Sequence, residues 1–71
     1  MKLILTKHAK QRMIERGIKM EEIEETINLP DYKVTKDQKI EVYKKINNKK
    51  LKIIYSVEGK FINIITVIDK Q

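Results

Sequence analysis

The sequence predicts an α+β fold in which a helical hairpin packs on one face of a twisted antiparallel sheet, in the order (β)ααβββ. Three observations predict this fold. Apolar residues recur at helical spacing in the first part of the chain, runs rich in Ile, Val, Tyr and Thr fill the second part, and Pro30 separates the two. The chain has 71 residues and no stretch that resembles a linker, so we expect residues 1–71 to form a single domain.

Residues 1–30 predict a short strand and two helices. The apolar segment KLIL suits a strand within residues 1–5, and Thr6 is a good N-cap for a helix over roughly 7–16. Gly17 suits the left-handed end of that helix. In KMEEIEETIN the apolar positions form one stripe, beside a run of glutamates that we expect to be solvated: Met20, Ile23 and Ile27.

The segment after Pro30 predicts strands over roughly 39–46, 50–57 and 60–68. The pairs NN at 47–48 and EG at 58–59 suit two-residue hairpin turns, so these strands should form a meander. This register places Val42 opposite Ile53, and Ile53 opposite Ile64. The face that should receive the helices then carries Ile40, Val42, Leu51, Ile53, Tyr55, Val57, Ile62, Ile64 and Ile68.

The other face of this sheet combines aromatic and apolar side chains with lysines. The same register places Tyr43 opposite Lys52, and Lys52 opposite Ile65, with further residues around them: Glu41, Lys45, Lys50, Ile54, Phe61, Asn63 and Val67. Such a surface suits a partner's helix, or a nucleic acid whose bases stack on the rings. The candidate contacts are Tyr43, Lys45, Lys50, Lys52 and Phe61. Alternatively, residues 1–5 or a homodimer cover this face.

The composition narrows the classes of partner and site. The formal net charge is +6, and residues 31–71 hold ten lysines against five acidic residues, which favours nucleic acid first and an acidic protein second. An AT-rich genome or a hot habitat also favours lysine among the amino acids, and this would give the same excess of positive charge. There is no cysteine and one histidine, so we expect no metal and no cofactor. No apolar run is long enough for a membrane span or a signal peptide, so we expect a cytoplasmic protein without membrane contact.

The segment TKHAKQRMIERG holds the only histidine and the only two arginines of the chain. Because His8, Arg12 and Arg16 are spaced four apart, they form one slanted stripe on a helix, which we call the His-Arg stripe. His8 could act as general base or acid in metal-independent RNA cleavage by the 2′-hydroxyl, with both arginines stabilising the phosphorane. The stripe could equally bind phosphate without catalysis. Alternatively, its role is structural: the arginine charge stabilises the C-terminal end of the helix, and the histidine donates a hydrogen bond to a backbone carbonyl. It would reach the lysine-bearing sheet face only at the rim of the sheet.

The string HAKQRMIERGIKMEEIEETI resembles the opening of a family of small proteins with the pattern H-A-x-x-R-M-x-x-R-G-I, grouped by sequence with the RelE/ParE toxin superfamily. The segment KLKIIYSVEGKFINIITVI is similar to that family's closing hairpin, so the resemblance covers nearly the whole chain. It implies a RelE/ParE-like domain, a compact α+β fold and pairing with an acidic antitoxin protein. RelE-like members cleave messenger RNA, often on the ribosome, whereas ParE-like members inhibit DNA gyrase.

The sequence departs from the RelE pattern, in which arginines on the strands and an aromatic residue near the C-terminus serve the cleavage site. Here the strands carry lysines, and the tail VIDKQ has no tyrosine. We expect a toxin-like protein of a toxin-antitoxin system that acts on RNA or ribosome-bound mRNA as a metal-independent endoribonuclease. The alternative is a non-catalytic binding module, either a gyrase-type protein inhibitor or a basic nucleic-acid-binding protein.

Overall fold

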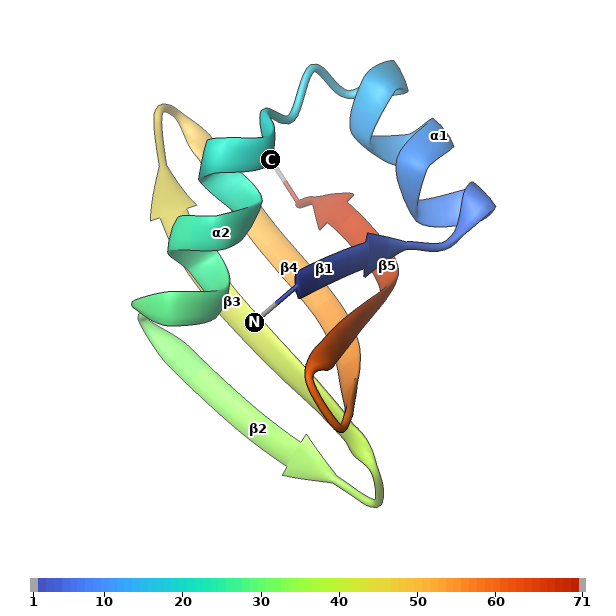
Figure 1. The fold of residues 1–71 in the computed structure, drawn as a ribbon. Coiled ribbons are helices and arrows are strands. Elements are labelled where there is room, and N and C mark those ends of the chain that lie inside the picture. Colours follow the sequence, from blue (N-terminus) through green and yellow to red (C-terminus); the bar gives the residue numbers. More distant parts are fainter. Residues whose placement is uncertain (1, 71) are drawn as a thin grey trace.

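The computed structural model describes residues 2–70, which form two helices on one face of a five-stranded sheet (Figure 1). The elements are β1 (Lys2–Leu5), α1 (Lys7–Glu15), α2 (Met20–Asn28), β2 (Tyr32–Lys36), β3 (Lys39–Ile46), β4 (Lys49–Glu58) and β5 (Phe61–Asp69). The strand order is β1-β5-β4-β3-β2, with β1 parallel to β5 and the other pairs antiparallel. The α+β class is confirmed, but the sheet is mixed and β2 was not predicted.

Helix α1 begins and ends where its capping residues predict. The Thr6 side chain accepts a hydrogen bond from the Ala9 N–H at 3.1 Å, and Gly17 has a φ of 62° just beyond the helix. Ala9 is fully buried, whereas His8 on the neighbouring position is exposed. None of the helices in the described part of the chain is long and apolar enough to cross a membrane.

Helix α2 buries Ile23 as its stripe predicts, but it also buries a glutamate. Glu22 is only 2% exposed, so the expectation that all these glutamates are solvated is wrong. Its position one residue before Ile23 turns the carboxylate toward the β3–β4 hairpin, where Asn47 and Lys49 bind it. The helix is therefore attached to the sheet by a polar contact as well as by apolar packing.

The β3–β4 register is as predicted, with Val42 opposite Ile53 and Tyr43 opposite Lys52. Asn47 and Asn48 form the two-residue turn, and both have positive φ, as a tight hairpin of this type requires. Residues Lys36 and Lys39 pair at the end of a further hairpin, between β2 and β3.

The β4–β5 register differs from the prediction for two reasons. The turn is Gly59–Lys60 rather than Glu58–Gly59, and a β-bulge lies where Ile54 pairs with Thr66 while Tyr55 pairs with Ile64. Ile53 therefore lies opposite Val67 instead of Ile64, and Lys52 lies opposite Ile68 instead of Ile65. Because one extra residue reverses the side-chain alternation, Val67 is buried in the core and Ile68 lies on the other face, the reverse of the prediction.

The core lies between the helices and one face of the sheet, and its buried sheet residues are Val42, Leu51, Ile53, Tyr55, Ile62, Ile64 and Val67. We call the opposite sheet surface the open face. Strand β1 does not cover it, because β1 lies beside β5 in the plane of the sheet (Figure 1). Within residues 2–70, both helices lie on the opposite side of the sheet and neither covers the open face.

Candidate functional site

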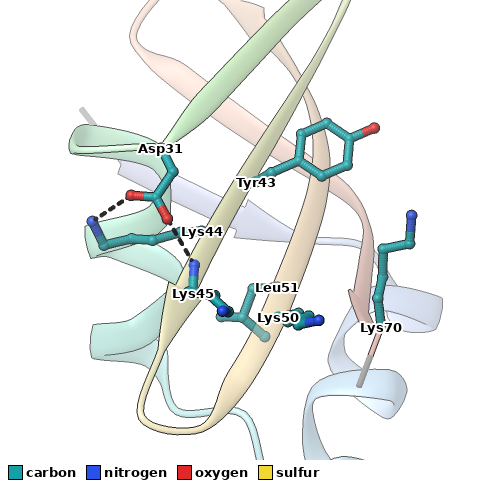
Figure 2. A pocket seen from close by; sticks show the side chains of 7 residues that line it. All are labelled: Asp31, Tyr43, Lys44, Lys45, Lys50, Leu51 and Lys70. Carbon is teal, nitrogen blue, oxygen red and sulfur yellow. Dashed lines mark hydrogen bonds and ion pairs between the residues drawn. The ribbon is translucent and has the colours of Figure 1, made fainter.

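A pocket of about 420 Å³ lies on the open face, over β3, β4 and the residue that follows β5. Three of its lining residues, Tyr43, Lys45 and Lys50, were predicted as contacts from the sequence. Lys70 also lines the pocket and was not predicted. Figure 2 shows the Lys45, Lys50 and Lys70 side chains around the mouth of this pocket, with the Tyr43 ring along one side. Lys70 was missed because it follows the last predicted strand, where periodicity gives no direction for a side chain.

Lys44, which lines this pocket, pairs with Glu25 and Asp31, but the other three lysines of the lining have no carboxylate partner within the described residues. Lys45 and Lys50 lie directly opposite each other on β3 and β4, an unfavourable position for two like charges. Neither they nor Lys70 has an ion pair within residues 2–70. Two carboxylates at the rim accept backbone hydrogen bonds: Asp31, which is also paired with Lys44, accepts from the Lys45 N–H at 2.9 Å, and Asp69 accepts from the Lys50 N–H at 3.2 Å. A bound anion would relieve the repulsion among the three ammonium groups.

Tyr43 is the aromatic centre of this site. The Nζ atoms of Lys52 and Lys70 lie 5.6 and 5.8 Å from the centroid of its ring, within range of a cation–π attraction. The Tyr32 ring centroid is 5.7 Å away, and the Tyr43 hydroxyl donates to Glu41 at 2.8 Å. Glu41 also pairs with Lys52 at 3.7 Å. These contacts hold a half-buried ring on the open face with cations beside it.

Phe61 belongs to a separate part of the open face. It is 43% exposed and lines its own hollow with Lys2, Gly59 and Lys60. The structure therefore brings together four of the five predicted contacts around Tyr43 and leaves the fifth, Phe61, at the other end of β4, opposite Glu58.

The His-Arg stripe lies at the rim of the sheet. Strand β1 pairs with β5 only as far as Ile64, and α1 packs beside the remaining half of β5 (Figure 1). The three stripe side chains line a groove of about 200 Å³, together with Thr66, Val67 and Ile68. Arg16 donates a hydrogen bond of 3.4 Å to the Asp69 carbonyl oxygen. The imidazole of His8 is exposed and has no hydrogen bond within the described chain.

The two candidate sites adjoin across β5. Ile68 lines the groove of the His-Arg stripe, and it pairs directly with Lys52, whose ammonium lies beside the Tyr43 ring. The bulge in β5 creates this arrangement, because it turns Ile68 to the open face. The groove of the His-Arg stripe and the Tyr43 site are therefore connected through the Ile68–Lys52 pair.

The buried Glu22 anchors the hairpin that carries Lys45 and Lys50. It accepts hydrogen bonds from the Lys19 N–H at 2.8 Å, the Asn47 side-chain amide at 2.9 Å and Lys49 at 3.0 Å. Burial alone would raise the pKa of this carboxyl, but the three donors and the Lys49 charge together lower it from 4.5 to about 2. Glu22 therefore stays ionised and fixes the turn of the hairpin against α2.

The chain thus combines an α+β fold with a basic, aromatic open sheet face and an arginine-bearing helix at the rim of the sheet. The chain belongs to the family described as domain of unknown function DUF4258, whose model matches residues 5–69. Comparisons with curated proteins and with solved structures found no match.

Proposed function

We propose that this protein acts on RNA as a toxin-type, RelE/ParE-like endoribonuclease that needs no metal. The open face binds the RNA, and the His-Arg stripe cleaves it. The observation that supports this most is the adjacency of the two sites, since Ile68 belongs to the groove of the stripe and pairs with Lys52 on the open face. The basic face also suits an acidic antitoxin protein, which would inhibit by occupying the same surface as RNA.

The stripe carries the groups that such cleavage needs. His8 removes the proton from a 2′-hydroxyl, whose oxygen then forms a bond to the adjacent phosphorus. The bond from phosphorus to the 5′-oxygen breaks, and the leaving oxygen takes a proton from water while the His8 imidazolium returns its proton to solvent, so the products are a 2′,3′-cyclic phosphate and a 5′-hydroxyl. Arg12 and Arg16 lie beside the same groove as His8, where their guanidinium groups stabilise the charge of the phosphorane.

A second candidate is a non-catalytic RNA-binding module. The hydrogen bond from Arg16 to the Asp69 carbonyl oxygen favours it, because a guanidinium that anchors α1 to β5 is less free to follow a reacting phosphate. In this case the open face binds RNA in the same way and no product forms. The two candidates share the binding surface and differ only at the stripe.

The salt dependence of the affinity for RNA tests whether the open face binds RNA. We compare the wild type with the triple variant Lys45→Gln, Lys50→Gln and Lys70→Gln, titrating a single-stranded RNA at several salt concentrations. Loss of three phosphate contacts should lower the slope of log K against log salt by about 2, since each contact to a single strand contributes about 0.7. The measurement is fluorescence anisotropy of a labelled RNA that carries 2′-methoxy groups and resists cleavage.

The matched control removes three exposed lysines from outside the open face, with Lys10→Gln, Lys19→Gln and Lys33→Gln. It changes the net charge equally and should retain most of the wild-type slope. Equal losses in the two triple variants would mean that binding follows overall charge rather than this surface. Absence of RNA binding by the wild type at low salt would contradict the proposed function itself.

A further inference from the structure

The open face carries an aromatic ring with neighbouring lysines at each of its two ends. At one end is Tyr43, with Lys52 and Lys70 beside its ring. At the other end is Phe61, which shares a hollow of about 590 Å³ with Lys2 and Lys60. Both hollows pair an apolar ring with ammonium groups, the combination that binds a base and its phosphate in single-stranded nucleic acids.

Strand pairing gives the separation of these two ends. Tyr43 lies opposite Lys52 on β4, and Phe61 lies opposite Glu58 on the same strand. Those partners are six positions apart on β4, so the rings are roughly 20 Å apart along the strand at about 3.4 Å per residue. One nucleotide cannot contact both ends, but an oligonucleotide can.

The surface between the two rings suits bases rather than phosphates. By register, the side chains that face this way between them are uncharged and half-buried, namely Ile54, Ser56, Asn63 and Thr66. The acidic residues that face this way on β3 and β4 are Glu41, which is paired with Lys52, and Glu58, which lies opposite Phe61. The Asp31 and Asp69 carboxylates lie at the rim of the Tyr43 pocket, hydrogen-bonded to the backbone of Lys45 and Lys50. Glu58 repels phosphate, so a phosphate at that end must lie on the side of Lys2 and Lys60.

We propose that the open face is a track for single-stranded RNA, with one stacking subsite at Tyr43 and a second at Phe61. This inference rests on the proposed function, and it adds the form of the substrate and its minimum length. Bases in a duplex are stacked on one another and cannot lie on protein rings, so double-stranded RNA is excluded from the track. The Tyr43 subsite is the stronger of the two, because Lys45, Lys50 and Lys70 adjoin it without carboxylate partners in the described chain.

The test is the dependence of affinity on RNA length. Oligouridines with 2′-methoxy groups, from the dinucleotide to the dodecanucleotide, are titrated into the full chain. Affinity should rise steeply until the RNA reaches both rings, and then level off within the range of roughly 4 to 16 nucleotides that single-strand binders cover. Phe61→Ala should weaken the longest RNA by about 10-fold and leave the dinucleotide unchanged, because the dinucleotide occupies the Tyr43 subsite.

Two further variants separate stacking from folding. Phe61→Leu keeps an apolar side chain at this half-exposed position but removes the ring, and it should reproduce the length-dependent loss. Leu29→Ala removes an exposed apolar side chain elsewhere and should change neither affinity. If Phe61→Leu binds every length as the wild type does, or weakens all lengths equally, the two-subsite track is wrong while RNA binding stands. If the wild type binds no RNA of any length, both the track and the proposed function fail.

Discussion

Replacement of Lys49 by Met is expected to lower the free energy of unfolding by about 3 kcal/mol at pH 7, because it leaves a buried carboxylate without its cation. The Glu22 side chain is 3% exposed and the Lys49 side chain 18%, with the charged atoms 3.0 Å apart. A chain of 71 residues typically has a total stability of about 4–10 kcal/mol. The variant should therefore be close to the limit of folding, as measured by urea unfolding monitored by circular dichroism.

The effect has a defined pH dependence. The folded-state pKa of Glu22 is about 2 and its ordinary value is 4.5, so the ionised carboxylate stabilises the fold above about pH 5. This contribution is lost as the pH falls from about 5 toward 2, and its full size is about 3 kcal/mol for a shift of this magnitude. Glu22→Gln should consequently be less stable than the wild type at pH 7, and the difference should decrease across this window.

The matched control is Lys33→Met, which removes an exposed lysine without a buried partner and should change stability by less than about 0.5 kcal/mol. Equal stability of Lys49→Met and Lys33→Met at pH 7 would show that the Glu22 contact contributes nothing. A constant difference between Glu22→Gln and the wild type from pH 7 to pH 2 would show that the Glu22 pKa is not lowered.

Replacement of His8 by Ala is expected to slow RNA cleavage by about 10²- to 10⁴-fold, the usual contribution of a general acid or base. Arg12→Ala should slow it by about 10²- to 10³-fold through loss of charge stabilisation. Binding of the cleavage-resistant RNA should change little in His8→Ala, because His8 lies in the groove at the rim and does not line the pocket of the open face. Rates are measured under single-turnover conditions with labelled single-stranded RNA.

Lys10→Ala is the control for these variants, since Lys10 is exposed on the same helix outside the stripe. Arg16→Ala should affect stability as well as rate, because Arg16 contacts the end of β5. Undiminished cleavage in folded His8→Ala and Arg12→Ala variants would remove the stripe from the reaction. The same variants provide the test in cells, where induced wild-type protein should arrest growth with cleaved transcripts and the variants should not.

The local features of the fold could be predicted because single residues determine them. Thr6 and Gly17 define the ends of α1, and the Asn47–Asn48 pair defines a tight turn. The β-bulge at Ile65 could not be predicted, because an extra residue in one strand leaves the apolar pattern intact while it reverses the faces after it. Strand β2 was missed because it is a short edge strand whose residues are mostly exposed, so it lacks an apolar run.

The candidate site, like the fold, could be predicted only where local sequence determines it. Spacing on a helix was enough to group His8, Arg12 and Arg16, and hairpin register was enough to place Tyr43 opposite Lys52. The adjacency of these two groups depends on the bulge, and the separation of Phe61 from Tyr43 depends on the turn and on pairing along β4. Neither the adjacency nor the separation can be predicted from the residue pattern of a single strand. The burial of Glu22 was missed because its partners on β3–β4 are distant in sequence.

The central claim, that this protein cleaves RNA without a metal, is tested most directly by incubating the purified wild-type chain with end-labelled single-stranded RNA in the presence of EDTA. We expect fragments that end in a 2′,3′-cyclic phosphate and begin with a 5′-hydroxyl, and we expect RNA with 2′-methoxy groups to stay intact. Intact RNA under conditions where the protein binds it would contradict the claim. The protein would then be a non-catalytic RNA-binding module.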